Sequence, residues 1–220
     1  MELNTVIFDM DGLLIDSEPL WKEAATEVFA SYGKKLSSEE YATTTGLRTA
    51  EFVAWWLRDF KFDTKELEKA GEHIVKLVIE KVKEKGKPLP GIEHIIDFFH
   101  ARKYKVGLAT SSPMSIAETV TNLLGINNYL QVITSAEKLD YGKPHPQVYL
   151  ECAKELKSSP LECICFEDSV NGMISAKAAR MKCVVVPTYN QQKDDRWSIA
   201  DLKISSLKNF SELHINLLNN

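Results

Sequence analysis

The sequence predicts an α/β protein: a doubly wound parallel sheet with a small, all-helical domain inserted near its start. Two observations carry this prediction. Short continuous apolar runs alternate with helix-length amphipathic segments through most of the chain, which is typical of parallel strands joined by crossover helices. Residues 18–85 break that alternation, because they show helical periodicity and almost no strand signal.

The first strand is expected at Thr5–Phe8, directly before the inserted helical segment. The insertion shows three helical faces, and we expect it to form a cap domain of residues 18–85 over a core domain of residues 1–17 and 86–220. The faces comprise Trp21, Ala24, Ala25, Val28 and Phe29; Phe52, Val53, Trp56 and Leu57; and Ile74, Leu77, Val78 and Val82. The pair Trp55 and Trp56 is expected in the core of this domain.

Strands and helices then alternate to residue 186. Pro90 and Gly91 open the first of these helices, and Gly125 ends the second. Strands are expected at residues 105–109, 131–134, 162–166 and 182–186, of which 131–134 is the weakest. Helices are expected at residues 92–103, 115–124, 147–156 and 171–179.

Composition and charge limit the function. The chain has 220 residues, of which 44% are hydrophobic, and a net charge of −4, so it has no overall attraction to nucleic acid. Neither a signal-peptide pattern nor an apolar run of membrane-spanning length is evident, and we expect a cytoplasmic monomer. The four cysteines show no zinc-ligand spacing and are expected to be buried, reduced thiols. The net charge of −4 is compatible with a small anionic ligand that local donors bind.

Asp9 and Asp11 follow the first apolar strand at positions i and i+2. Side chains at that spacing point the same way along an extended chain, and the carboxyl end of a central parallel strand faces the crevice where α/β sheets bind ligands. Two carboxylates so close repel each other unless a cation lies between them or one keeps its proton. Mg²⁺ is the economical cation, although an Asx-turn that closes the strand is the plain alternative.

Other strand ends carry residues suited to phosphoryl transfer. Thr110, Ser111 and Ser112 follow one strand, and their hydroxyl and backbone N–H groups could hold phosphate oxygens. Lys143 lies in a turn with two prolines, and Glu167 and Asp168 end another strand. Each feature alone has a plain explanation, namely a helix cap, a surface lysine or an acidic helix start. If all of these plain explanations held, separate coincidences would have placed such residues at the same edge of one sheet.

The assembled order resembles the haloacid dehalogenase superfamily over essentially the whole chain. The residues that carry the resemblance are Asp9-Met10-Asp11-Gly12, Thr110, Lys143 and Glu167-Asp168, which are similar to its four motifs in order. The inserted helices look like the family's C1 cap. Within the superfamily the chain is similar to sugar phosphatases and β-phosphoglucomutases, and Asp16-Ser17-Glu18-Pro19-Leu20 is typical of the phosphatases.

The resemblance implies a role for each matching residue. Asp9 would attack phosphorus and form an aspartyl-phosphate, and Asp11 would serve as general acid and then as general base. Thr110 and Lys143 would bind the transferring phosphoryl group. The implied Mg²⁺ site comprises Asp9 and Asp168, with Glu167 in or next to its shell and Asp11 also assigned to it.

Selectivity is expected in the cap. Thr45-Gly46-Leu47-Arg48 resembles the family's substrate-specificity loop, which would place Arg48 over the sugar or its phosphate. The residues expected to contact substrate are Gly46, Arg48, Ser111, Ser112 and Trp21.

The resemblance implies an Mg²⁺-dependent phosphatase for a small phosphorylated sugar or polyol, similar to the 2-deoxyglucose-6-phosphate phosphatases. A β-phosphoglucomutase is the runner-up, but that family has a histidine where this chain has Trp21. A dehalogenase is a poorer match, because those enzymes lack the second acid of the first motif and Asp11 is present here. A non-catalytic binding module would be expected to have lost at least one of Asp9, Asp11, Lys143 or Asp168.

Overall fold

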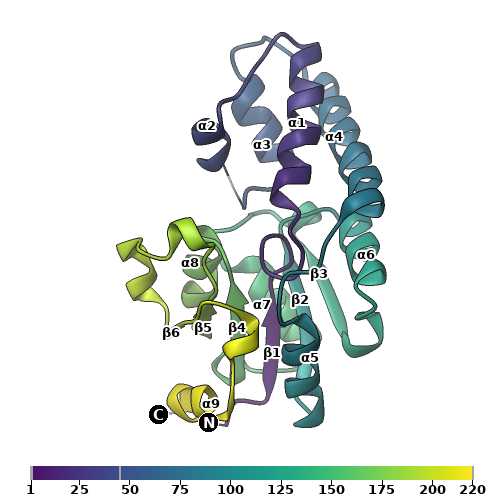
Figure 1. Ribbon diagram of the computed structural model, residues 1–220. Coiled ribbons are helices and arrows are strands. Elements are labelled where there is room, and N and C mark those ends of the chain that lie inside the picture. The colour runs from purple at the N-terminus through teal and green to yellow at the C-terminus, as the bar shows by residue number, and fades with distance from the viewer. Residues whose placement is uncertain (1, 45, 220) are drawn as a thin grey trace.

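The core of the protein is a six-stranded, all-parallel sheet with strand order β3-β2-β1-β4-β5-β6 (Figure 1). The computed structural model describes residues 2–44 and 46–219. The strands are β1 (Thr5–Phe8), β2 (Lys105–Thr110), β3 (Val132–Ser135), β4 (Cys163–Glu167), β5 (Lys182–Val185) and β6 (Leu202–Lys203). This arrangement confirms the predicted doubly wound sheet.

Strand β1 lies at the centre of the sheet, and its register aligns the ends that carry the candidate site. Phe8 pairs with Leu108 of β2 on one side and with Phe166 of β4 on the other. The residues just beyond these pairs therefore emerge at one edge of the sheet. That edge is where ligands bind in open α/β sheets.

Helices cover both faces of the sheet. Successive side chains of a strand point to opposite faces, so neighbouring residues of β1 pack against different helices. Phe8 packs in one hydrophobic cluster with residues of α5, α6 and α9, whereas Ile7 packs in a second cluster with residues of α7 and α8. The helices are α5 (Ile92–Ala101), α6 (Met114–Leu123), α7 (Gln147–Glu155), α8 (Val170–Ala178) and α9 (Glu212–Asn219).

The described part of the insertion, residues 18–44 and 46–85, contains four helices, where the periodicity had indicated three. They are α1 (Glu18–Ser31), α2 (Ser38–Ala42), α3 (Thr49–Leu57) and α4 (Thr64–Lys85). Figure 1 shows them together at the end of the molecule opposite both termini, beyond the carboxyl ends of the strands. Helix α4 buries a stripe of residues at near four-residue spacing and packs against α1, α3 and the core helix α6.

The structure corrects some of the predicted details. Trp55 is 50% exposed, with the Arg58 guanidinium 4.4 Å from its ring, so it is not a core residue. Short α2, two-residue β6 and C-terminal α9 were not predicted, because their apolar patterns are too short to show a clear period. The four cysteines are buried and free, as predicted. None of the described helices is both long and apolar enough to cross a bilayer.

Candidate active site

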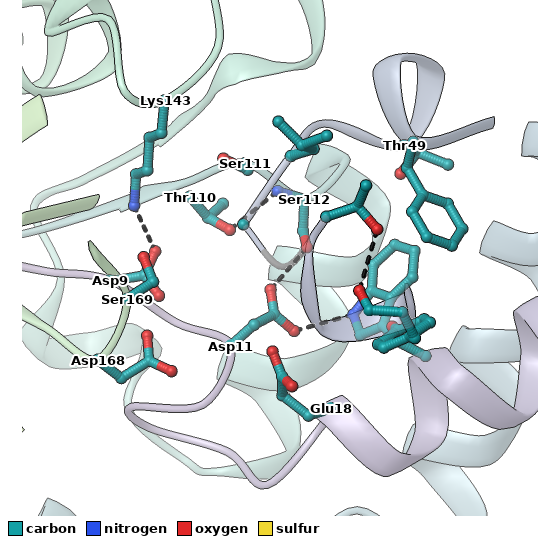
Figure 2. Close-up of a pocket in the computed structure, with 16 residues that line it drawn as sticks. Asp9, Asp11, Glu18, Thr49, Thr110, Ser111, Ser112, Lys143, Asp168 and Ser169 are labelled. Atoms are coloured by element: carbon teal, nitrogen blue, oxygen red, sulfur yellow. Dashed lines mark hydrogen bonds and ion pairs between the residues drawn. The ribbon is translucent and has the colours of Figure 1, made fainter. Parts of the chain in front are cut away.

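A pocket lies between the sheet edge and the inserted helices. Asp9 follows β1, Thr110 ends β2, and Lys143 comes from the segment between β3 and α7. Trp21 of α1 and Gly46, which precedes α3, line the same pocket from the insertion. Figure 2 shows the core carboxylates and Lys143 gathered on one side of the view and Thr49 on the other.

Lys143 is the charged centre of the core side. Its side chain is 2% exposed, and its Nζ lies 2.6 Å from Asp9 Oδ1 and 2.7 Å from Glu167 Oε1. It also donates to the Ala109 carbonyl oxygen at 3.1 Å and to the Tyr149 hydroxyl at 3.3 Å. Burial alone would lower the pKa of this ammonium, but the carboxylates of Asp9 and Glu167 raise it, so Lys143 stays charged.

Three buried acids crowd around this one lysine. Oxygen atoms of Asp9, Glu167 and Asp168 lie within 4.8 Å of one another. Burial raises the pKa of Asp9 to about 8, although Lys143 opposes the shift. Burial, followed by the charges of Asp9 and Glu167, raises the pKa of Asp168 well above its usual value. One ammonium cannot balance three carboxylates, and a hard divalent cation with oxygen ligands fits this donor set.

Glu167 differs from the other two acids because protein donors engage both of its oxygens. Oε1 accepts from Lys143 and, at 2.5 Å, from the Tyr149 hydroxyl. Oε2 accepts from the backbone N–H groups of Asp168 and Ser169 and from the Ser169 hydroxyl, at 3.2 to 3.3 Å. Glu167 is fully buried and holds Lys143 in place. Asp9 and Asp168 are therefore better placed than Glu167 to bind a metal.

Two glycines make room for these carboxylates. A Cβ on Gly12 would lie 2.1 Å from Asp168 Oδ2, and a Cβ on Gly172 would lie 1.8 Å from Glu167 Oε1. Gly12 also has a φ of +77°, a backbone conformation that residues with a side chain rarely adopt. The Asp-x-Asp-Gly turn and the start of α8 thus both require a residue without a side chain.

Asp11 lies apart from the buried acids and is fixed by three donors. Oδ1 accepts from the Ser17 hydroxyl at 2.5 Å and from Trp21 Nε1 at 3.1 Å. Oδ2 accepts from the Ser112 hydroxyl at 2.6 Å, a bond that Figure 2 shows. It is not part of the acidic group that could hold a metal among the described residues. Protein donors thus hold both oxygens of the Asp11 side chain, and its expected acid, base and metal-binding roles stay predictions.

Trp21 and Ser112, which were expected to contact substrate, line the pocket and also orient Asp11.

The segment after β2 offers groups that suit a phosphoryl oxygen. Thr110 is buried, and its Oγ1 accepts from the Ser112 backbone N–H at 3.0 Å, which leaves its own proton to donate. The Ser111 hydroxyl is buried and has no hydrogen-bond partner among the described residues. Both residues line the pocket beside Asp9 and Lys143. Thr110, Ser111 and Lys143, which the sequence predicted to bind the phosphoryl group or the substrate, thus line one pocket.

Arg48 takes a different place from the one expected. Its Nη1 donates to the carbonyl oxygens of Leu139 at 2.6 Å and Ala136 at 3.4 Å, and its Nη2 lies 2.6 Å from Glu51 Oε1. Arg48 is not among the described residues that line the pocket, whereas Gly46 is. The guanidinium joins the insertion to the segment after β3 through these carbonyls, while its buried Nε has no hydrogen-bond partner among the described residues. Thr45, which was expected in the same loop, lies outside the described residues.

Comparison with known proteins assigns the family. The family model for haloacid dehalogenase-like hydrolases matches residues 6–186. The chain belongs to this family. Hexitol phosphatase B of Escherichia coli (strain K12) is 42% identical over 207 residues, which cover 94% of this chain and 93% of that protein. The phosphorylated carbohydrates phosphatase of Thermotoga maritima is 32% identical, with 87% and 89% covered.

A solved haloacid dehalogenase-type structure is similar over the whole fold. β-Phosphoglucomutase of Clostridium difficile superposes with a TM-score of 0.89 at 25% identity, covering 99% of this chain and 97% of that one. These matches confirm the predicted family, the predicted fold and the predicted enzyme class, a phosphatase.

The motifs did not point to several residues of this haloacid dehalogenase site. Tyr149, which contacts both Lys143 and Glu167, lies in the first turn of α7 with no local signal. Glu18 belongs to the run Asp16–Leu20 that resembles the phosphatases, but that resemblance gave it no role in the site. Glu18 and Thr49 line the pocket from α1 and α3. Local sequence marks residues at strand ends, but it does not mark residues that reach a site through helix packing.

Proposed function

We propose that this protein is an Mg²⁺-dependent phosphatase that hydrolyses small sugar or polyol phosphates through an aspartyl-phosphate on Asp9. One observation carries the proposal: Asp9, Thr110 and Lys143 lie in one pocket with Asp11, which is held separately by three donors. A nucleophile, phosphoryl-binding groups and a proton donor are thus present together. The hexitol phosphatase and phosphorylated carbohydrates phosphatase relatives support the substrate class.

The reaction needs two displacements at phosphorus. In the first, an Asp9 oxygen forms a bond to phosphorus while the bond to the sugar oxygen breaks, and Asp11 donates the proton that the leaving oxygen takes up. In the second, water attacks the phosphoryl group, Asp11 accepts the proton, and Asp9 is released. Lys143 and Thr110 stabilise the charge on the phosphoryl oxygens in both steps.

The metal would be held by Asp9 and Asp168, whose oxygens belong to the buried acidic group described above. When bound, Mg²⁺ supplies positive charge beside the phosphoryl oxygens and offsets the crowded carboxylates. Glu167 contributes by orienting Lys143, since its own oxygens accept from protein donors.

The two sides of the pocket come from different parts of the chain, which supports a different role for each part. We propose that residues 1–17 and 86–220 form the core domain that carries the chemistry, and that residues 18–85 form a cap domain that selects the substrate. Closure of such a cap excludes water and assembles the site around a fitting substrate. The expected monomeric state also stays a prediction.

A panel of phosphate esters tests the proposal. We expect phosphate release from hexitol and hexose monophosphates, including 2-deoxyglucose 6-phosphate, only with Mg²⁺ and not from Asp9→Asn. Nucleotide monophosphates should be turned over more slowly. Release in excess chelator, or equal rates across sugars and nucleotides, would contradict the proposal.

A mutase is the alternative that the structural neighbour raises, since β-phosphoglucomutase shares the fold. Incubation with β-glucose 1-phosphate separates the two activities. A phosphatase releases inorganic phosphate, whereas a mutase yields glucose 6-phosphate. We expect release, because Trp21 stands at the position of the mutase histidine and donates to Asp11.

A further inference from the structure

The wall of the pocket that the insertion supplies is poor in positive charge. Lys143 is the one lysine or arginine among the described residues that line the pocket, and its ammonium is engaged by Asp9 and Glu167. Arg48, which would be the nearest candidate by sequence, binds backbone carbonyls outside it. A second phosphate on the substrate would therefore meet no free cation among the described residues of this wall.

The same wall carries a carboxylate. Glu18, in the first turn of α1, lines the pocket and is partly exposed. It shares the pocket lining with Asp168 on the core side and with Tyr41 on the insertion side, so its charge acts on both sides of the pocket. A carboxylate accepts hydrogen bonds from sugar hydroxyls and repels an anionic group.

Thr49 adds a hydroxyl group that the protein itself leaves unused. Its Oγ1 is buried and has no hydrogen-bond partner among the described residues, while its Cγ2 lies 3.8 Å from the place of a Cβ on Gly71 in α4. The methyl group therefore packs toward α4, and Thr49 still lines the pocket. Leaving a buried hydroxyl unpaired costs free energy, so a ligand that pairs with it is favoured.

We propose that this wall selects an uncharged, hydroxyl-bearing leaving group, with Thr49 recognising a substrate hydroxyl and Glu18 excluding a second phosphate. The inference rests on the proposed phosphatase activity and names the substrate class as monophosphates of polyols or sugars, against bisphosphates. Ser111 provides the matching unpaired hydroxyl on the core side, where the phosphoryl group binds.

Thr49→Val tests the hydroxyl, because valine keeps the shape and removes the oxygen. We expect kcat/KM for a hexitol 6-phosphate to fall by about 10-fold more than kcat/KM for acetyl phosphate, which has no hydroxyl. Thr49→Ser should restore most of the difference. Thr64→Val is the matched control, because Thr64 is also the first residue of a cap helix but is exposed. Equal losses on both substrates, or no loss, would overturn the role of Thr49.

Glu18→Gln tests the exclusion of charge. Wild-type protein should prefer a hexitol 6-phosphate over the hexitol 1,6-bisphosphate, and the glutamine variant should narrow that preference by about 10-fold. An unchanged preference, or a wild-type preference for the bisphosphate, would overturn the inference and leave the phosphatase activity standing. If the wild type releases phosphate from acetyl phosphate but from no sugar or polyol monophosphate, both the proposed function and this inference fail.

Discussion

The pocket has a core wall, formed by residues at the ends of the strands, and a cap wall, formed by residues of the inserted helices. The residues of the two walls are positioned in different ways. On the core wall, Asp9, Thr110 and Asp168 lie at or just beyond the ends of hydrogen-bonded parallel strands, so backbone register fixes their places. On the cap wall, Trp21 and Thr49 reach the pocket from helices whose positions depend on side-chain packing. From this comparison we propose that the sheet positions the groups for phosphoryl chemistry, whereas the inserted helices set selectivity and can vary without disturbing the sheet.

Asp9→Asn should produce the largest effect, because it removes the nucleophile from the core wall. We expect kcat to fall by about 10⁴-fold or more on every substrate, since losing a nucleophile disables the whole catalytic unit. Steady-state phosphate release measures the loss, and circular dichroism checks the fold. Asp97→Asn, an exposed position on α5, is the control and should keep wild-type activity. A trapped acyl-phosphate on another residue would move the assignment.

Asp11→Asn should come next, with a loss that depends on the leaving group. General acid catalysis contributes about 10²–10⁴-fold, and it matters less when the leaving oxygen is already a weak base. We therefore expect a large fall in kcat for a hexitol phosphate and a smaller one for p-nitrophenyl phosphate. Similar losses on the two substrates would argue against proton donation by Asp11.

The same difference between the walls explains what the sequence could predict. Asp9, Asp11, Thr110, Lys143 and Asp168 stand beside apolar strand patterns or prolines, and the structure brings all of them to one pocket. Arg48 could not be placed, because its direction depends on whether carbonyls after β3 come within reach of α3. Tyr149 and Thr49 could not be found either, since no local pattern distinguishes them from ordinary helix residues.

The third prediction concerns the proposed metal site. It has two parts: a stabilisation by Mg²⁺ that depends on pH, and a higher Mg²⁺ requirement when Asp168 is substituted. Without metal, burial raises the pKa of Asp9 to about 8, so this carboxyl holds a proton in the folded protein that it loses in the unfolded chain. The proton stabilises the fold at low pH, and that stability is lost as pH rises from about 4 through about 8. Mg²⁺ needs the ionised form, so its binding strengthens over the same interval.

Thermal unfolding with and without Mg²⁺ measures this linkage. We expect the rise in Tm on adding Mg²⁺ to be larger at pH 8 than at pH 6. Asp168→Asn should raise the Mg²⁺ concentration for half-maximal activity by at least about 10-fold. A Tm shift that is independent of pH, or an unchanged Mg²⁺ requirement in the variant, would contradict a metal held by Asp9 and Asp168.

Arg48→Ala should have the smallest effect. It tests whether Arg48 contacts the substrate or only connects the cap wall to the core. The guanidinium bonds to Leu139 and Ala136 lie in the segment that leads to Lys143, so their loss loosens the cap against the core. We expect kcat/KM to fall by a similar factor, about 10-fold, on a hexitol phosphate and on acetyl phosphate, because closure precedes chemistry for both.

A matched control separates this effect from the loss of any surface arginine. Arg102 likewise binds a carboxylate, Glu212, and a backbone carbonyl, that of Phe98, but both partners lie outside the insertion, in α9 and α5. Arg102→Ala should therefore leave kcat/KM on both substrates near the wild-type values, as expected for an exposed ion pair. If Arg48→Ala instead impairs the hexitol phosphate far more than acetyl phosphate, Arg48 turns into the pocket when substrate binds. The cap wall would then carry a cation in the closed complex, and the boundary between the two walls would have to be drawn again.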